Sequence, residues 1–560
     1  MLDDFCKMLA EGLVEDTLQE CSRWCTRRLV MPPPHEGPFT FKYHPWQKDI
    51  LNSKAVQISA KKSAQMGYSV AGMAKALHNI EQKRVDTLYV LPTAVLAGDF
   101  SKARLANILG QSPQLKDLFQ KGNAVGLKIA HNGSSLYIRG SVSESSLVSV
   151  PVGFIVVDEF DRCAKNTLSL VWERTASFAD RQLFALSTPT LPEWGISEQY
   201  DLGDKRHFYF DCPSCSRKIQ LRWPDNVEIH GDCSTSPECY NSFYKCNECG
   251  AKLPHEGKWE YLNTGLWIPE DKGCHGHESY HINQMYHCTL TAGDLAVAYF
   301  KGVGDEAAAT EWFNQKLGES YMIEGARVTE GMIKDAIARG GGYYKEQQRP
   351  KDASRMIVMG VDVGSFLDVC IVEYLYTANP GNEPHLNSRA RVLFEGRLPG
   401  QDWHILDHMM AEWQVQYACV DFQPETNKAS EFARRFPRHA GLVRYREGTT
   451  GTEIKETSDD HRVPFLTVDR TVFFDLTLGR FHKGRIELPA DVTGSFKEHV
   501  MAPCRTYELD TIGNPQAKYV SRDKPDHLAN AMVYAEIAHL KAYYRSTGRT
   551  MKVGESYFNM

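Results

Sequence analysis

A lysine, a glycine and a serine stand close together in the segment KSAQMGYS, which lies between a β-branched run and a helical pattern. Gly67 and Ser69 are in register with the phosphate-binding pattern G-x-x-x-x-G-K-[ST], but Tyr68 takes the place of its lysine. We expect Lys62, at the other end of the loop, to supply the cation for the phosphates and Ser69 to supply a hydroxyl for Mg²⁺. Taken alone, the segment fits an ordinary strand–helix turn equally well.

Four apolar residues followed by two carboxylates form the run FIVVDE (154–159). A buried strand that ends in acids places them at the edge where open α/β sheets bind ligands. Asp158 is predicted to hold Mg²⁺, and Glu159 to orient and deprotonate the attacking water. The alternative is a strand that simply ends in solvated acids.

Other segments flank these two motifs in an order that favours an ATPase. Thr188, after a further apolar strand, is a candidate sensor of the γ-phosphate, and Gln47 in YHPWQ offers an amide for adenine. Lys61 is a weaker substitute for the loop lysine. Arg104 is a candidate arginine finger, although a solvated helix face explains it more simply. Several elements in the right order indicate ATP and Mg²⁺ binding more strongly than any one of them.

Four of the 15 cysteines form two C-x-x-C steps separated by 30 residues: Cys212, Cys215, Cys246 and Cys249. Such pairs in a chain without secretory features favour metal binding over disulfides. Four thiolates predict a closed, structural zinc site, because a catalytic zinc keeps one position open. Cys233 and Cys239 lie between the pairs and could extend the site or compete for it.

The C-terminal half contains three acids at the ends or centres of apolar elements. Asp362 lies within the strand RMIVMGVDVG, Asp421 ends the strand YACVD, and Asp526 is expected in the first turn of a helix. Each could be a solvated acid or a helix cap. Together they predict a ribonuclease-H-like nuclease in which Asp362, Asp421 and Asp526 bind two Mg²⁺ or Mn²⁺ ions. Glu425 and Asp523 are the substitutes.

Positioning these residues requires an α/β protein of several domains, since 560 residues exceed a single core. Continuously apolar strands that alternate with helices predict a parallel sheet. A Gly-rich, charged stretch (340–355) is typical of a linker. The predicted division is a helical segment (1–36), an ATPase core (37–205), a zinc-ribbon insertion (206–290), a helical part with linker (291–345), a nuclease (346–545) and a tail (546–560).

The composition is that of a globular protein, with 42% hydrophobic and 24% charged residues. No apolar run reaches the length that crosses a bilayer, and the acidic, amphipathic start is unlike a secretory signal. We therefore expect a cytoplasmic protein that does not act in a membrane. The net charge of −6 leaves DNA binding open, because a local basic groove suffices.

Over about residues 37–545 the chain resembles the lambda-like, GpA-type family of phage terminase large subunits. The segments on which this resemblance rests are KSAQMGYS, VVDEFDR, ALSTPT, CPSC…CNEC with GKWEYLNTGLW, SYHINQMY and WFNQKLGE. The lysine at the start of the loop is similar to this family's own variant, which supports Lys62. The ending KPDHLANAMVYAEIA is more similar to other terminases than to lambda's own, which puts Asp526 in more doubt than Asp362.

The resemblance implies an ATPase joined to a ribonuclease-H-like nuclease in a DNA-packaging motor. Its implied partners are double-stranded DNA, a small terminase subunit near the N-terminus, the procapsid portal near the C-terminus, and further copies in a ring. The implied location is the host cytoplasm, with transient docking at the portal. The rivals are a DNA helicase or translocase without a nuclease, and a non-enzymatic zinc-ribbon DNA-binding protein.

Overall fold

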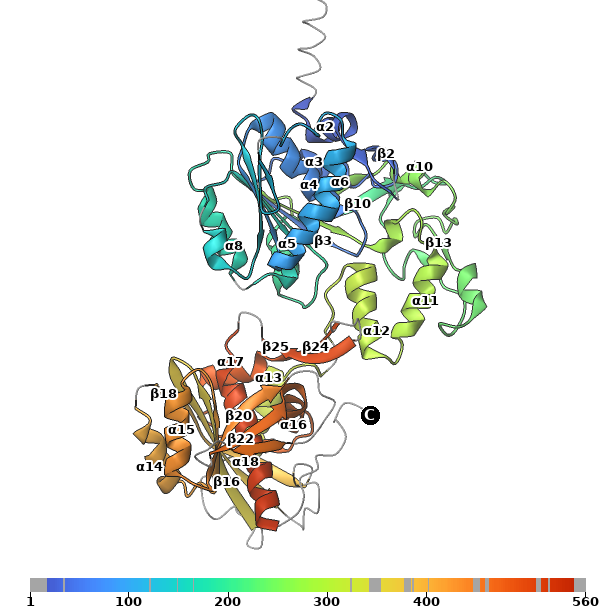
Figure 1. Ribbon diagram of the computed structural model, residues 1–560. Coiled ribbons are helices and arrows are strands. Elements are labelled where there is room, and N and C mark those ends of the chain that lie inside the picture. The colour runs from blue at the N-terminus through green and yellow to red at the C-terminus, as the bar shows by residue number, and fades with distance from the viewer. Residues whose placement is uncertain are drawn as a thin grey trace, which may run out of the picture. The chain divides into compact units, whose positions relative to one another are not determined.

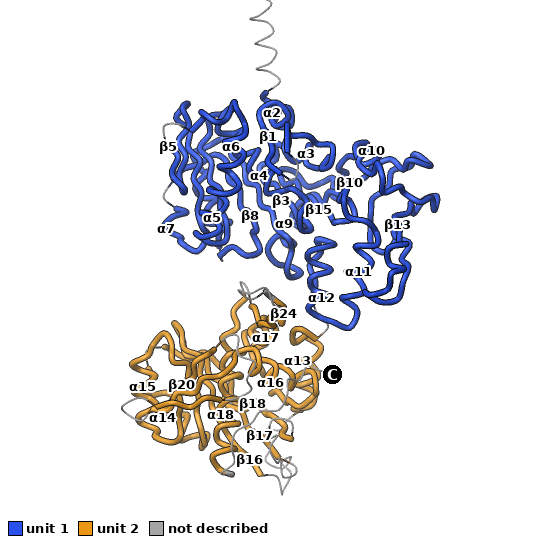
Figure 2. Tube along the Cα trace, turned by 45° about the vertical axis from the view of Figure 1, so that its right-hand side comes forward, with its two compact units in different colours: residues 1–322 blue, residues 323–560 orange. Residues whose placement is uncertain are grey.

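The computed structural model divides the chain into two compact units, residues 1–322 and residues 323–560 (Figure 2). It describes residues 18–33, 36–119, 122–148, 150–164, 166–322, 325–341, 354–376, 384, 387–400, 402–446, 454–458, 463–509, 515–521 and 524–547. Most of the predicted N-terminal segment, the middle of the predicted linker, Asp523 and most of the tail lie outside these residues. None of the described helices has the length and apolarity needed to span a membrane.

The first unit is built on a sheet with helices beside it (Figure 1). The strand order is β11-β10-β15-β3-β9-β8-β4-β7-β6-β5, with β14 beside β10. Its parallel strands are β10 (Arg206–Asp211), β15 (His277–Ile282), β3 (Gln57–Lys62), β9 (Gln182–Ser187), β8 (Phe154–Asp158), β4 (Thr87–Leu91) and β7 (Ser135–Gly140). Antiparallel strands complete it: β11 (Lys218–Ile219), β14 (Leu266–Pro269), β6 (Leu127–Ile129) and β5 (Gly122–Ala124). The parallel sheet predicted from the continuously apolar strands is confirmed.

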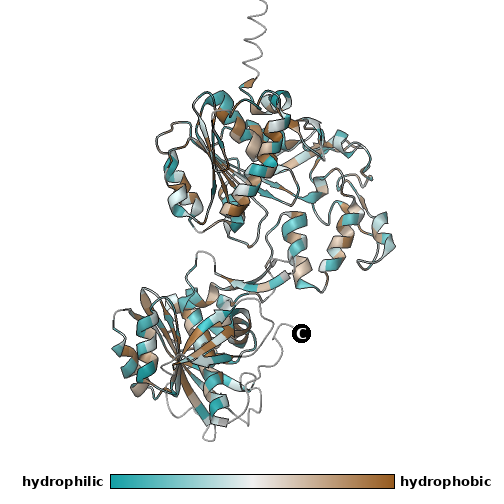
Figure 3. Ribbon diagram, viewed as in Figure 1, coloured by the Kyte–Doolittle hydropathy of each residue, from teal (hydrophilic) through white to brown (hydrophobic). Residues whose placement is uncertain are grey.

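Every residue of β4, β8 and β9 is buried, as expected of parallel strands covered on both faces. Alternate residues of these strands join two separate hydrophobic clusters, one on each side of the sheet. The apolar residues accordingly gather on the central strands (Figure 3). The helices of this part of the unit are α2 (Cys21–Arg28), α3 (Gln47–Asn52), α4 (Tyr68–His78), α5 (Ala94–Asp99), α6 (Ala106–Gln111), α7 (Glu144–Leu147), α8 (Thr167–Trp172) and α9 (Gly195–Leu202).

The cysteine-rich region shares the sheet of the first unit, because its strand β15 lies between β10 and β3. It also contains the paired strands β12 (Val227–Glu228) and β13 (Phe243–Tyr244) and a short helix, α10 (Lys258–Leu262). The helical pattern expected after residue 293 is present as α11 (Ala292–Gly302), α12 (Glu306–Glu311) and the π-helical turn η7 (Trp312–Leu317).

The second unit is a mixed sheet with the order β21-β22-β20-β19-β16-β17-β18-β23. An antiparallel meander of β16 (Ser354–Val363), β17 (Phe366–Tyr376) and β18 (Ser388–Pro399) is extended beside β16 by the parallel strands β19 (Tyr417–Asp421), β20 (Ala440–Arg446) and β22 (Pro464–Asp469). The remaining strands are β21 (Lys455–Ser458), β23 (Ile486–Glu487) and the separate hairpin β24 (Cys504–Leu509) and β25 (Pro515–Val520).

Helices cover both faces of this sheet. Helices α14 (His404–Glu412) and α15 (Thr426–Arg435) pack on one face, and the other holds α13 (Glu330–Gly340), α16 (Arg470–His482), α17 (Gly494–Met501) and α18 (His527–Thr547). Helix α18 lies directly on β16 at Gly360, where an added Cβ would come within 1.9 Å of the Ala531 carbonyl oxygen. This close approach brings the start of α18 beside Asp362, two residues further along β16.

Candidate active sites

The phosphate-loop segment turns from the end of β3 into the start of α4. Gly67 precedes α4 with a φ of 80°, a left-handed conformation that glycine adopts without steric cost. The loop is held from outside, because the Ala64 amide donates to the carbonyl oxygen of Gln315, and an added Cβ at Gly318 would meet the Ser63 amide. The loop is thus fixed against the WFNQKLGE segment.

Lys62 meets two of the groups predicted to act with it. Its ammonium donates to the hydroxyl of Thr188 at 3.1 Å and pairs with the Glu159 carboxylate at 3.3 Å. Tyr68, which takes the usual place of the lysine, is instead buried within the hydrophobic cluster. The residue at the start of the loop therefore brings its charge to the carboxyl ends of β8 and β9.

Asp158 and Ser69 also converge. The Asp158 carboxylate accepts hydrogen bonds from the Ser69 hydroxyl and, at 2.7 Å, from the Tyr89 hydroxyl. Burial and the neighbouring Glu159 raise the pKa of Asp158, while these two hydrogen bonds and Lys62 oppose the shift. A serine hydroxyl beside a buried carboxylate is the donor set that a phosphate-bound Mg²⁺ requires.

Gln47 contacts the phosphate loop itself. Its amide donates to the Met66 carbonyl oxygen at 3.4 Å, beside a second donor, the Trp46 indole N–H at 3.1 Å. An added Cβ at Gly67 would lie 2.2 Å from the same amide nitrogen. Adenine binding by Gln47 stays a prediction. Arg104 lies exposed on the π-helical turn η2 (Phe100–Leu105).

Asp161 is a buried residue that our sequence analysis did not select. Its carboxylate accepts hydrogen bonds from the amide and hydroxyl of Thr190 at 2.8 and 2.9 Å, and from the Ile196 amide at 2.7 Å. Its own amide donates to the Ser187 hydroxyl. Asp161 therefore ties the acidic end of β8 to the loop after β9. The sequence contained a signal for Asp161, because it is the third acid of the segment VVDEFDR, after Asp158 and Glu159.

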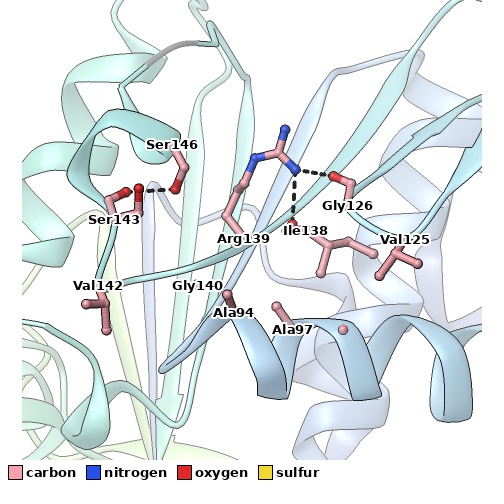
Figure 4. Close-up of a pocket in the computed structure, with 11 residues that line it drawn as sticks. Ala94, Ala97, Val125, Gly126, Ile138, Arg139, Gly140, Val142, Ser143 and Ser146 are labelled. Carbon is pink, nitrogen blue, oxygen red and sulfur yellow. Dashed lines mark hydrogen bonds between the residues drawn. The ribbon is translucent and has the colours of Figure 1, made fainter.

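A cavity of about 550 Å³ lies apart from these groups, between α5, the β5–β6 turn, β7 and α7 (Figure 4). Arg139 lines it and donates to the carbonyl oxygens of Gly126 and Ile138. No residue predicted for the ATP site lines this cavity.

The four predicted zinc ligands come together, with their sulfur atoms within 4.8 Å of one another: Cys212, Cys215, Cys246 and Cys249. Both pairs form the same turn, in which the residue after the second cysteine has positive φ and donates its amide to the carbonyl of the first. These residues are Ser216 (φ 59°) and Gly250 (φ 73°). The backbone amide of Ala251 lowers the pKa of Cys249 to about 7, which favours the thiolate. The arrangement fits a zinc ion.

In the second unit Asp362, Asp368 and His527 form a group whose ligand atoms lie within 4.8 Å of one another. The imidazole Nδ1 of His527 contacts the Asp362 carboxylate at 2.9 Å, and Asp368 pairs with Arg397 at 3.0 Å. Burial raises the pKa of Asp362 to about 7, and the hydrogen bond to Asp362 raises that of His527. Oxygen and imidazole ligands in this spacing fit a divalent ion.

Asp368 and His527 were not predicted, although a signal existed for each. Asp368 is the antiparallel register partner of Asp362 across the β16–β17 hairpin, and His527 directly follows Asp526.

Asp421 and Asp526 lie near this group without joining it. Both raise the pKa of Asp362 as neighbouring charges, after burial. Burial raises the pKa of Asp421, whose carboxylate accepts from the Gln423 amide at 3.2 Å. Asp526 pairs with Arg470 at 3.5 Å and accepts from Ser521. The expectation that Asp526 lies in the first helical turn is wrong, because α18 begins one residue later and Asp526 accepts its first backbone bond, from Asn530.

The first unit is thus an N-terminal parallel-sheet ATPase domain with a four-cysteine cluster, and the second unit is a mixed sheet with an acidic centre. Residues 34–267 match the model of the phage terminase large subunit gpA ATPase domain. This part of the first unit is therefore similar to that family.

Similarity to individual proteins extends further along the chain. A terminase large subunit of Enterobacteria phage P21 is 20% identical over 354 residues, 57% of this chain. The chain spans about half the length of that relative, 55%. The large terminase of bacteriophage HK97 is similar over 92% of this chain and 98% of its own, at 9% identity and a TM-score of 0.49. The magnesium-bound nuclease of phage G20c is similar over 33% and 82%, at 14% identity and a TM-score of 0.20.

Proposed function

We propose that this chain is the large subunit of a double-stranded DNA phage terminase. Its first unit hydrolyses ATP to move DNA into a procapsid, and its second unit cuts concatemeric DNA with a two-metal nuclease. The observation that carries the proposal is the presence of a second acidic centre in the same chain as a GpA-type ATPase domain. A helicase or translocase would leave that centre without a role.

The strand order of the second unit supports a ribonuclease-H-like nuclease. A three-stranded antiparallel meander is followed by three parallel strands beside its first strand, and acids lie on the first and fourth strands and before the last helix. Asp362, Asp421 and Asp526, with Asp368 and His527, would hold the divalent ions. Such ions activate water and stabilise the leaving oxygen. The Nδ1 atom of His527 lies 2.9 Å from the Asp362 carboxylate and would orient it.

The ATP site has residues for each part of hydrolysis. Lys62 would neutralise phosphate charge, Ser69 and Asp158 would hold Mg²⁺, and Glu159 would orient and deprotonate water. Thr188 and Gln47 would contact the γ-phosphate and the adenine. The contact of Lys62 with both Glu159 and Thr188 supports this assignment.

The division proposed for the chain keeps the predicted boundaries: an ATPase core (37–205), a zinc ribbon (206–290), a helical part with linker (291–345) and a nuclease (346–545). The first 36 residues would contact a small subunit, and residues 546–560 the portal. The chain would work as a ring in the host cytoplasm, docked at the portal during packaging. Zinc at the four cysteines would be structural, because no ligand position stays open.

The test is the cutting of supercoiled plasmid by the purified chain with Mn²⁺ or Mg²⁺, beside Asp362→Ala. We expect metal-dependent nicking that the variant loses while its ATP turnover persists. ATP turnover without cutting under either metal would favour the translocase. A chain with neither activity, even with DNA present, would favour a zinc-ribbon DNA-binding protein.

A further inference from the structure

An arginine of the second unit contacts two aromatic rings near the carboxyl edge of the sheet that carries the proposed nuclease centre. The guanidinium carbon of Arg444, on β20, lies 4.2 Å from the ring centroid of Phe422 and 4.1 Å from that of Phe465. The two rings are 5.1 Å apart and nearly perpendicular, at 82°. Phe465 is buried, whereas the Arg444 side chain is exposed. Contacts with two rings restrict the guanidinium in the free protein. Binding a ligand therefore costs less conformational entropy of this side chain.

The charge of Arg444 is not neutralised by the part of the chain that the structure describes. Within those residues its guanidinium donates to no carboxylate or carbonyl, and its contacts are the two rings. Several other arginines of the unit are paired with acids: Arg391 with Glu487, Arg397 with Asp368, Arg435 with Asp407, Arg470 with Asp526, Arg480 with Glu536 and Arg505 with Asp475. An exposed, restrained cation that pairs with no acid of the protein is suited to bind an anionic group of a ligand.

Strand register places the backbone of Arg444 one residue beyond the partner of Asp421. Asp421, the last residue of β19, is the parallel partner of Val443, and Arg444 is the next residue. The Phe422 amide continues the ladder by donating to the Val443 carbonyl oxygen at 3.2 Å. Side chains alternate along a strand, so Arg444 lies on the sheet face of Leu442, opposite to that of Val443. Asp421 shares the face of its register partner Val443, so Arg444 and Asp421 lie near the same carboxyl edge of the sheet but on opposite faces.

We propose that Arg444, held by Phe422 and Phe465, binds a backbone phosphate of the DNA at the carboxyl edge of the sheet, on the face opposite to the nuclease acids. This inference rests on the proposed nuclease function. The planar guanidinium can donate two parallel hydrogen bonds to phosphate oxygens, and such a contact fixes the register of the strand without reading its sequence. Arg444 is a positioning residue that leaves the chemical step to the acids.

The test is the binding of a fluorescent DNA duplex in EDTA at several salt concentrations, for wild type, Arg444→Gln and Arg444→Lys. Each phosphate contact contributes a slope of about 0.9 to the fall of log K with log salt. We expect Arg444→Gln to lower affinity and reduce this slope by about 0.9. Arg444→Lys keeps the charge and should keep the slope with weaker binding, because its ammonium lacks the planar fork.

Arg435→Gln is the matched control. Arg435 also lies near a phenylalanine ring, at 5.7 Å from Phe432, but pairs with Asp407. It ends α15, the helix that crosses back from β19 to β20, so it lies at the opposite edge of the sheet. The control should bind DNA with the wild-type slope. An unchanged slope in a folded Arg444→Gln, or the same loss in Arg435→Gln, would overturn the proposal.

Cutting assays separate this proposal from the nuclease function. With metal, Arg444→Gln should raise the KM for plasmid and leave kcat near that of wild type. An unchanged KM would overturn the role of Arg444. Wild-type protein that binds DNA but never cuts would instead refute the nuclease, and the salt slope in EDTA would still decide whether Arg444 contacts phosphate.

Discussion

In the first unit the carboxylates of Asp158 and Glu159 share the end of a strand with a cation of the same site, Lys62, which lies 3.3 Å from Glu159. In the second unit Asp362 lies beside one histidine, His527, and near several further carboxylates. Like charges that cannot all ionise together raise one another's pKa.

This difference teaches where each site obtains its positive charge. The proposed ATP site carries a permanent cation on its own loop. In the proposed nuclease centre the arginines pair with Asp368 and Asp526, whereas Asp362 faces a titratable imidazole. The second site should therefore respond strongly to metal and pH, and the first should respond most to loss of one lysine.

The largest expected effect is on ATP turnover. Lys62→Ala removes the only cation bound to both Glu159 and Thr188 among the described residues, and should lower turnover about 100-fold or more. Lys61→Ala is the matched control, because Lys61 lies on the other side of β3 over the Tyr200 ring. It should stay within a few-fold of wild type in the same phosphate-release assay. Equal losses would remove the special role of Lys62.

Loss of the cysteine site should mainly affect the stability of the first unit. Cys246→Ser should abolish binding of about one zinc ion per chain and lower the free energy of unfolding by several kcal/mol. Elemental analysis and thermal melts measure the two effects. Cys233→Ser changes an exposed cysteine between the pairs and should keep both zinc and stability. Full zinc content in Cys246→Ser would contradict the assignment.

The pH dependence of metal binding should distinguish the second site. Burial raises the pKa of Asp362 to about 7, so a proton competes with metal below that pH. Affinity for Mn²⁺ in calorimetry should fall roughly tenfold per pH unit below 7 and level off above it. Without metal, the folded state holds this proton more tightly than the unfolded state, so stability should decrease as pH rises from about 4 to 7. A flat profile that Asp362→Asn does not alter would contradict this account.

A smaller effect is expected at Asp161, which positions the loop after β9 without contacting the proposed nucleotide groups. Asp161→Asn replaces an acceptor of three hydrogen bonds and should cost about 1–3 kcal/mol of stability. ATP turnover should fall about tenfold, with little change in the KM for ATP. Steady-state kinetics and melts decide this; a normal kcat would leave Asp161 a purely structural residue.

The sequence predicted the parts of the fold that depend on local pattern. Apolar runs gave the central strands of both units, and the C-x-x-C spacing gave a cluster of four sulfur atoms.

What escaped prediction depends on pairing between strands and on helix packing. Asp368 becomes a neighbour of Asp362 only through the hairpin register, and His527 through the packing of α18 on Gly360. The start of α18 was predicted one residue too early, because an aspartate such as Asp526 is equally compatible with the N-cap and with the first turn of a helix. The order of β15 between β10 and β3 likewise follows from long-range pairing.

The most direct test of a motor and a nuclease in one chain measures both activities in the same preparations of wild type, Lys62→Ala and Asp362→Ala. We predict that Lys62→Ala loses ATP turnover and still nicks plasmid with Mn²⁺, and that Asp362→Ala does the reverse. Cutting that persists in Asp362→Ala, or ATP turnover that persists in Lys62→Ala, would contradict the account.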